Sequence, residues 1–339
     1  MTYAEITGPD GATIEVDAPA RLHLGFLDLH GGLGRRFGSI GLTVDSLATR
    51  LHAQRADGIT ASGPAAERAL KYARAFIEAS AIPGGVHIEL SQAIPDHVGL
   101  GSGTQMALAV GTAIERLYGG ERGTDAIARV LRRGTRSGIG IGAFDQGGFI
   151  LDCGRGEAEG VPPVAVRLPF PESWRMLLLF DNRGQGLHGK HEVSAFEQLP
   201  EFPEQAAAHL CRLVLMQVLP GVLEQRLQPV TEAIGEIQRV VGDHFAPAQG
   251  GRFTSPVISQ ALDWITRRGF AGVGQSSWGP TGFVLVEDET QAQWLERGLR
   301  QRFGEFSSFR CQQVAARNQG AGVNLLQAPT RLRQEKRAR

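Results

Sequence analysis

The 339-residue chain has room for two domains of ordinary size, and its 35 basic and 35 acidic residues cancel, so no overall charge points to nucleic acid or to an anionic membrane. The N-terminus carries no basic stretch followed by an apolar run, and no window approaches about 18 uninterrupted apolar residues, which predicts a chain that is neither secreted nor membrane-spanning. The balanced charge favours a small-molecule partner. The three cysteines lie far apart and match no zinc or redox spacing, which favours reduced thiols in a cytoplasm.

The first predicted element is a strand at residues 13–28, where apolar and polar side chains alternate. We expect one face of this strand to be buried. The alternation places Leu22, Leu24 and Phe26 on the buried face and Arg21 and His23 on the other.

The rest of the chain alternates between strand-like and helix-like patterns. In the first half we predict strands at 40–51, 86–90 and 149–152 and helices at 65–79, 105–118 and 125–134. In the second half we predict strands at 176–180, 279–286 and 311–316 and helices at 206–219, 227–241, 255–268 and 291–303. This order indicates an α+β fold with a joint at 155–165, and hence two lobes at 1–160 and 161–330. The basic tail at 331–339 is predicted to be disordered.

The segment from Pro95 to Thr104 is predicted to be a glycine-rich loop that leads into the helix at 105–118. Its glycines let the backbone approach a ligand closely, and the first N–H groups of the helix, which we expect Ser102 or Thr104 to cap, point at that ligand. These features predict a phosphate or pyrophosphate site. It is not a Walker A loop, because no lysine follows the last glycine, and Thr104 replaces the last glycine of a dinucleotide-binding loop.

Two other segments accompany the loop in a fixed order. The strand segment Ala18-Pro-Ala-Arg-Leu-His-Leu-Gly25 precedes it, and the turn Gly272-Val-Gly-Gln-Ser-Ser-Trp-Gly-Pro-Thr-Gly282 comes late in the chain. The three segments together resemble the GHMP kinase superfamily, over essentially the whole chain. That resemblance implies an N-terminal lobe with a ribosomal-protein-S5-like fold, a ferredoxin-like C-terminal lobe, and a phosphate loop between them.

A closer resemblance lies in three loops, at 94–105, 136–150 and 183–189, which are similar to those of the β-ribofuranosylaminobenzene 5′-phosphate synthase family. The resemblance implies a condensation of phosphoribosyl pyrophosphate with 4-aminobenzoate or 4-hydroxybenzoate. Pyrophosphate and carbon dioxide are released, and a C-riboside 5′-phosphate remains, as a step of methanopterin biosynthesis. The family likeness also implies a homodimer. Cys153 and Arg155 depart from the glycine and histidine that we expect after the strand at 149–152.

The loop chemistry and the resemblance together predict which residues hold the phosphorylated substrate. We expect the loop to grip the diphosphate or the 5′-phosphate, with arginines as further ligands and Mg²⁺ bridging diphosphate oxygens. No metal ligand is assigned. The predicted binding residues are Arg21, Gly99, Leu100, Gly101, Ser102, Gly103, Thr104, Gln105, Arg136 and Arg183. For Arg21 and Arg183, a solvated or structural arginine is the open alternative.

Loss of the carboxylate needs electrons from the para group of the ring, and a proton acceptor near that group helps. The candidate acids and bases are Asp145, Glu192, His97 and His188. Asp145 is alternatively a turn carboxylate bonded to its own glycine backbone. His188, His191 and Glu192 alternatively face solvent or bind a metal.

An ATP-dependent small-molecule kinase of the same superfamily is the main alternative function, with Asp145 as its base. Asp145 lies seven residues after Gly138, which is a longer separation than these kinases lead us to expect. A catalytically silent ligand-sensing protein is a third possibility, and the presence of Asp145 and Glu192 argues against it.

Overall fold

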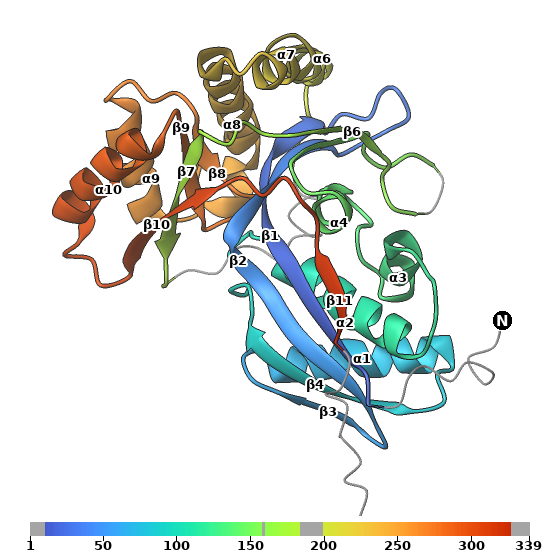
Figure 1. Cartoon of the computed structure of the whole chain (residues 1–339). Coiled ribbons are helices and arrows are strands. Elements are labelled where there is room, and N and C mark those ends of the chain that lie inside the picture. Colours follow the sequence, from blue (N-terminus) through green and yellow to red (C-terminus); the bar gives the residue numbers. More distant parts are fainter. Residues whose placement is uncertain (1–10, 158–159, 184–198, 327–339) are drawn as a thin grey trace, which may run out of the picture.

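The computed structural model describes residues 11–157, 160–183 and 199–326. These residues form two lobes, each built on one sheet with helices against it (Figure 1). In Figure 1 the N-terminal lobe lies in the lower right part of the view and the C-terminal lobe in the upper left part.

The elements have the following bounds. The larger sheet contains β1 (Thr13–Asp28), β2 (Gly38–Ala56), β3 (Ile59–Ser62), β4 (Gly85–Gln92), β5 (Phe149–Asp152), β6 (Val164–Leu168) and β11 (Gly322–Leu326). The smaller sheet contains β7 (Arg175–Asp181), β8 (Val273–Gln275), β9 (Gly282–Val286) and β10 (Phe309–Ala315). The helices are α1 (Ala66–Ser80), α2 (Ser102–Leu117), α3 (Thr124–Val130), α4 (Ile139–Asp145), α6 (Glu204–Leu213), the π-helical segment η2 (Val214–Val218), α7 (Leu219–Leu223), α8 (Leu227–Gln249), α9 (Pro256–Thr266) and α10 (Glu289–Phe303).

The larger sheet has the order β11-β1-β2-β4-β3, with β5 paired to β2 and β6 paired to β5. The smaller sheet has the order β10-β7-β9-β8. Strands β6 and β11 belong to the larger sheet although they follow residue 160, so that sheet draws on both sides of the predicted joint. The chain therefore returns to its first lobe at its end.

Strand β1 joins the two hydrophobic cores of the molecule. Its first half contributes Ile14 and Val16 to a core formed with α1 and α2. Its second half contributes Leu22 and Leu24 to another core, which includes Ile237 of α8 and other residues of the C-terminal lobe. Because one continuous strand is buried in both cores, the two lobes are held together by packing as well as by the chain.

The central strand of the smaller sheet, β7, is an uninterrupted apolar run because helices cover both of its faces. Leu177 and Leu179 pack with residues of α9 and α10, while Met176 and Leu178 face the core that contains α8. A strand covered on both sides loses the alternation of apolar and polar residues that a half-exposed strand shows.

The α+β fold expected from the sequence is confirmed, and every predicted strand and helix overlaps an observed one. Four short strands, β3, β6, β8 and β11, were not predicted, since runs of three to five residues carry little periodicity. The glycine-dense run after Ser137, to which no element was assigned, contains α4. The helix predicted at 206–219 is α6 followed by η2 and α7.

One expectation about β1 is wrong. His23 was placed on an exposed face, yet it is only 4% exposed. The reason is tertiary: its backbone N–H donates to the Ser276 hydroxyl at 3.0 Å, and its ring lies 4.5 Å from that of Phe26. The C-terminal lobe thus covers the second face of β1.

The continuous helical segment Glu204–Leu223 is, by length and composition, apolar enough to cross a membrane. One side of it, including Leu210 and Val218, packs into the core shared with α8 and β1. Leu215 and Met216 on its other side are exposed. A core helix of a globular protein also meets this length and composition test, and one side of this segment packs against the core.

Candidate phosphate-binding site

The predicted loop lies directly before α2 and takes a conformation that suits glycine. Gly99 and Gly101 have φ angles of +86° and +80°, in the left-handed region that other residues adopt only with strain. Gly101 is the N-cap residue, and its carbonyl accepts from the N–H groups of Thr104 and Gln105. Neither Ser102 nor Thr104 caps the helix, so that expectation is wrong: the backbone of Gly101 takes this place.

The N–H groups of Ser102 and Gly103 occupy the first positions of α2, where no intrahelical acceptor exists. The dipole of this 16-residue helix adds partial positive charge at the same point. Two free donors and a positive helix end together form an arrangement that binds anions such as phosphate.

The three sequence motifs meet at the carbonyl of Gly99. Arg21 of β1 donates to it through Nη1 at 2.7 Å, and Ser276 of the late turn donates to it through its hydroxyl, also at 2.7 Å. A Cβ atom on Gly99 would lie 2.2 Å from the carbonyl oxygen of Ser276. The loop is therefore clamped between β1 of one lobe and a turn of the other.

Two arginines that the sequence did not single out lie at the start of α2. Arg68 of α1 donates to the Ser102 hydroxyl at 3.3 Å and forms an ion pair with Asp96. Burial lowers the pKa of Arg68; Tyr72 opposes this shift and the positive charge of Arg133 adds to it. Arg133 follows α3, donates to the Tyr72 hydroxyl, and has Nη1 3.7 Å from the Cβ position of Gly103. No local pattern in the sequence marks either arginine.

The predicted phosphate ligands fall into two groups. One group lies together at the start of α2 and contains Arg21, Gly99, Gly101, Ser102, Gly103 and Thr104, whereas Leu100 and Gln105 pack with neighbouring elements. Gln105 is fully buried and donates to the carbonyl of Gly140 at 2.7 Å, and Leu100 is a core residue.

The two remaining predicted arginines lie on separate segments. Arg136 is half-buried in the connection between α3 and α4. Arg183 extends from the end of β7 and pairs with Asp181, with Nε 3.0 Å from one carboxylate oxygen. Its guanidinium is held by that carboxylate.

Of the four predicted acids and bases, two are described. His97 is exposed within the loop segment. Asp145 ends α4 and accepts from the hydroxyl of Thr124, and burial, only partly offset by that hydrogen bond, raises its pKa. His188 and Glu192 lie outside the described residues.

Helix α4 separates Asp145 from the loop. The second residue of α4, Gly140, lies against Thr104, because a Cβ atom on Gly140 would be 3.0 Å from the Thr104 methyl group. Six further steps of about 1.5 Å each carry the chain roughly 9 Å from Ile139 to Asp145. The start of α4, not its end, is next to the loop.

A buried carboxylate that the sequence reasoning missed secures the start of α4. Asp152, at the end of β5, is 1% exposed and accepts from the hydroxyls of Ser39 and Ser137 and from the N–H groups of Gly138 and Gly154. Burial raises the pKa of Asp152 against the effect of these hydrogen bonds. Such a set of donors holds a carboxylate in place, so its role here is to fix the segment from Ser137 onward.

A cavity of about 360 Å³ lies between the lobes beside the loop. Its lining combines apolar side chains with a few polar ones: Leu47, Pro95, Asp96, Val98, Phe180, Asp181, Asn182, Pro280, Arg310, Cys311 and Gln312. Burial alone would raise the pKa of Asp181, but hydrogen bonds from Arg183 and Ser255 hold it at about 2. A cavity with this lining accommodates a small planar molecule with a polar end.

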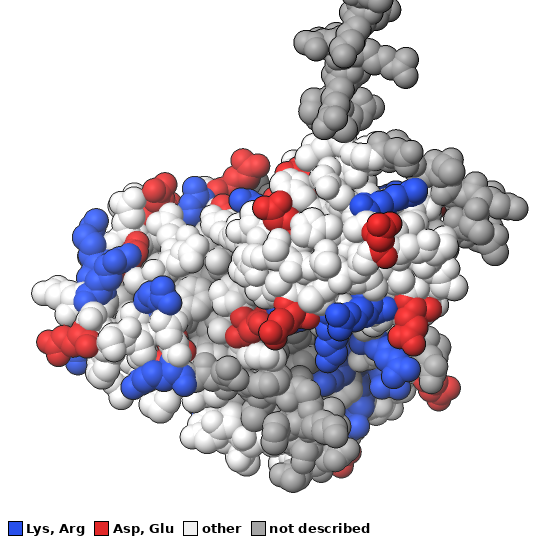
Figure 2. All heavy atoms as spheres, turned by 90° about the horizontal axis from the view of Figure 1, so that it is seen from below, with Lys and Arg blue, Asp and Glu red and all other residues white. Residues whose placement is uncertain are grey.

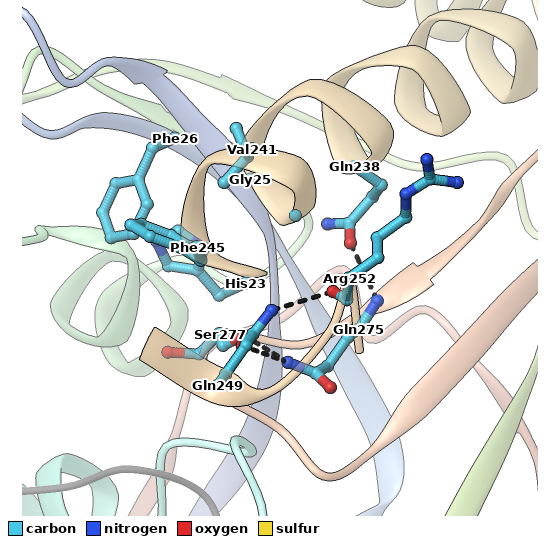
Figure 3. A pocket seen from close by; sticks show the side chains of 11 residues that line it. His23, Gly25, Phe26, Gln238, Val241, Phe245, Gln249, Arg252, Gln275 and Ser277 are labelled. Carbon is cyan, nitrogen blue, oxygen red and sulfur yellow. Dashed lines mark hydrogen bonds between the residues drawn. The ribbon is translucent and has the colours of Figure 1, made fainter. Parts of the chain in front are cut away.

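A second, much smaller cavity lies beside His23 and Ser277 (Figure 3). Its volume of about 20 Å³ is room for one water molecule. Figure 3 shows a chain of hydrogen bonds through Gln238, Gln275 and Gln249 along one side. Burial, helped by the charge of Arg21, lowers the pKa of His23 to about 3. His23 is therefore a neutral packing residue near pH 7.

Basic and acidic side chains lie near one another on the surface of this molecule. On the face drawn in Figure 2, basic side chains lie in several separate places, a number of them beside acidic side chains. Across the described residues, no three His, Cys, Asp or Glu side chains gather in a way that would hold a metal ion.

Comparison with known proteins gives consistent matches. The family model described as GHMP kinases N terminal domain matches residues 66–152, and that described as GHMP kinases C terminal matches residues 218–305. The β-ribofuranosylphenol 5′-phosphate synthase of Archaeoglobus fulgidus is 30% identical over 92% of this chain and 99% of its own. That of Methanocaldococcus jannaschii is 30% identical over 80% of this chain and 88% of its own. The homoserine kinase of Cytophaga hutchinsonii shares the fold, with a TM-score of 0.63 at 19% identity over 94% of this chain and 98% of its own.

Proposed function

The chain belongs to the β-ribofuranosylphenol 5′-phosphate synthase family of the GHMP kinase superfamily and is an enzyme of this synthase type, and from this premise we propose its substrates. We propose that it transfers a phosphoribosyl group from phosphoribosyl pyrophosphate to 4-hydroxybenzoate or 4-aminobenzoate. The observation that carries the proposal is the anion site at the start of α2. The relatives' names contain a phenol, which 4-hydroxybenzoate would leave in the product, so this acid is the first to test.

In the proposed reaction the bond between ribose C1 and the diphosphate oxygen breaks, and the diphosphate takes both electrons. The free N–H groups of Ser102 and Gly103 and the guanidinium groups of Arg68 and Arg133 stabilise the negative charge of this leaving group. The orientation of the two N–H groups is set before the substrate arrives, because β1 and the late turn clamp the loop at Gly99. C1 becomes electron-poor and is attacked by the ring.

The aromatic acid is proposed to lie in the cavity beside Asp96, with its ring against apolar walls such as Phe180 and its carboxylate toward Arg310. The ring carbon that bears the carboxylate forms the bond to C1. The carboxylate then departs as carbon dioxide and leaves its bonding electrons in the ring. His97 is the described group of the loop segment that can take and return the proton of the para hydroxyl group, while His188 and Glu192 stay predictions.

Mg²⁺ remains a proposed cofactor. Among the described residues, no three His, Cys, Asp or Glu side chains come together to bind a metal ion. This fits an ion that is held mainly by diphosphate oxygens and water. Asp96 is the carboxylate of the loop segment itself and is the proposed protein ligand. When bound, the ion would neutralise charge on the diphosphate.

The kinase alternative is weaker on physical grounds. A kinase of this type needs a group that positions or deprotonates the attacking alcohol. The first turn of α4, which meets the loop at Thr104, begins with Ile139, Gly140 and Ile141, and none of these side chains accepts a proton. Asp145, the acid of the kinase hypothesis, is at the other end of the helix.

The decisive experiment uses carboxyl-labelled 4-hydroxybenzoate, and 4-aminobenzoate in parallel. We expect release of labelled carbon dioxide that requires phosphoribosyl pyrophosphate and does not require ATP. ADP formation from ATP and an alcohol, without carbon dioxide, would instead identify a kinase. Binding of phosphoribosyl pyrophosphate without turnover of any kind would identify a sensing protein.

The loop assignment has its own test. Ser102→Ala and Gly101→Ala variants that remain folded should bind phosphoribosyl pyrophosphate more weakly than the parent chain. If both bind it normally, the ligand does not lie on the loop.

Three further features are proposed from the family alone: a step in tetrahydromethanopterin biosynthesis, a cytoplasmic location and a homodimer. Light scattering after size-exclusion chromatography tests the homodimer directly, since a mass near twice that of the chain supports it and a single-chain mass contradicts it.

A further inference from the structure

A second basic site lies beyond the loop, at the connection between α3 and α4. It is a cavity of about 510 Å³ whose lining contains four arginines: Arg129, Arg132, Arg133 and Arg155, together with Thr135, Gly160 and Val161. We call this the arginine pocket. Three of the arginines come from the end of α3 and the residues after it, and the fourth comes from the corner after β5.

The four arginines have no acidic partner within the described part of the chain. Other arginines, among them Arg122, Arg252 and Arg300, form ion pairs with nearby carboxylates, but none of the ion pairs between described residues includes a member of the arginine pocket. Four like charges around one cavity repel each other. An anion in the cavity would remove that repulsion.

Arg133 connects the arginine pocket with the start of α2. It lines the cavity, and its Nη1 also lies 3.7 Å from the Cβ position of Gly103. Its Nε is buried and has no hydrogen-bond partner among the described residues, and the same holds for Nε and Nη2 of Arg68. Guanidinium donors that are buried without an acceptor carry a desolvation cost that a bound anion would offset.

We propose that the start of α2 and the arginine pocket form one elongated site with two anion positions, so that the arginine pocket holds the second phosphorylated end of a substrate whose first phosphorylated end lies on the loop. This rests on the proposed function, since phosphoribosyl pyrophosphate carries a diphosphate at one end and a 5′-phosphate at the other. A ligand with two anionic ends uses both positions at once. A ligand with a single phosphate group uses only one.

The test compares the Arg129→Gln/Arg132→Gln double variant with an Arg297→Gln/Arg302→Gln double variant, whose side chains are exposed on α10, far along the chain from the arginine pocket. Calorimetric titration with phosphoribosyl pyrophosphate measures affinity without requiring turnover, and titration with pyrophosphate probes a ligand with one anionic end. Circular dichroism and thermal unfolding check that both variants fold. Arg155→Gln serves as an independent second variant of the arginine pocket.

We expect the Arg129→Gln/Arg132→Gln variant to bind phosphoribosyl pyrophosphate at least about tenfold more weakly, as loss of charge-assisted hydrogen bonds predicts, and the α10 variant to bind it like the parent. Pyrophosphate fits on one position, so the Arg129→Gln/Arg132→Gln substitutions should lower the affinity for pyrophosphate by a smaller factor than the affinity for phosphoribosyl pyrophosphate. An affinity for phosphoribosyl pyrophosphate within twofold of the parent in both pocket variants overturns the proposal.

The outcomes separate this inference from the proposed function. If labelled carbon dioxide is released and the pocket variants bind phosphoribosyl pyrophosphate as the parent does, the synthase reaction is supported and the second anion position is refuted. If binding of phosphoribosyl pyrophosphate depends on the pocket arginines but no labelled carbon dioxide is released, the two-position site is supported and the proposed reaction is refuted.

Discussion

The hydroxyl of Ser276 donates to the carbonyl of Gly99 at 2.7 Å, across 177 positions of sequence. The same hydroxyl accepts from the backbone N–H of His23 at 3.0 Å, and the same carbonyl accepts from Arg21 at 2.7 Å. Two atoms thus join β1, the phosphate-binding loop and the turn before β9. The shape of the anion site depends on this junction between the lobes.

Gly99→Ala should destabilise the protein at this junction. The new Cβ atom would lie 2.2 Å from the Ser276 carbonyl oxygen, and alanine is strained at a φ of +86°. We expect a loss of at least about 2 kcal/mol in the free energy of unfolding, measured by urea denaturation. Gly58→Ala is the control, since its Cβ atom would meet nothing within 4 Å. Equal stability of the two variants would contradict the clamp.

Arg68→Gln should weaken binding of phosphoribosyl pyrophosphate by about tenfold, because it removes a charged donor beside Ser102. Arg74→Gln, on the exposed face of the same helix, should leave the affinity unchanged. The KM of both variants in the carbon dioxide assay gives the measurement. An unchanged KM in folded Arg68→Gln would show that this guanidinium does not meet the substrate.

Asp145→Asn should keep kcat within about threefold of the parent, because the carboxylate lies at the end of α4 away from the loop and bonds Thr124. If Asp145 were the general base, its removal would lower kcat by about 100-fold to 10,000-fold. Asp125→Asn, at a neighbouring exposed carboxylate, serves as the control. A loss of 100-fold or more in a folded Asp145→Asn protein would restore Asp145 as the acid or base and with it the kinase reading.

Protonation of the unfolded chain should make stability depend on pH through His23. Its folded pKa of about 3 lies below the ordinary value of 6.5, so the unfolded state binds a proton first as the pH falls. The contribution of His23 to the free energy of unfolding is complete above pH 6.5. It is lost as the pH falls from 6.5 toward 3, at about 1.4 kcal/mol per pH unit.

Urea denaturation between pH 7.5 and 5 measures this effect. Between pH 7.5 and 5, the free energy of unfolding of His23→Gln should fall by about 2 kcal/mol less than that of the parent. His87→Gln, at an exposed histidine of β4, should keep the parent's slope. If His23→Gln falls as steeply as the parent, the buried histidine is not the cause.

Removal of divalent cations should abolish release of carbon dioxide, since a free diphosphate is a poorer leaving group than one bridged by Mg²⁺. Dialysis against EDTA followed by readdition of Mg²⁺ gives the measurement. We expect thermal stability without substrate to stay unchanged, because the described carboxylates form no metal cage. Full activity in EDTA would refute a role for the ion.

The sequence by itself determined those parts of the molecule that local patterns encode. Alternation over residues 13–28 predicted β1, helical spacing predicted α2, and the glycines between Gly99 and Gly103 predicted where the anion site lies. Each of these depends on backbone preferences and on side-chain spacing within one element. The fold class followed from the order of such elements.

Tertiary structure alone decided which side chains surround the loop. Arg68 reaches Ser102 across 34 positions and Arg133 reaches Tyr72 across 61, and neither contact leaves a local pattern. It also buried His23, because the C-terminal lobe covers the second face of β1, and it carried Asp145 away from the loop on α4. Spacing within one helix or strand is set by backbone geometry, whereas contacts between distant segments are set by how whole elements pack.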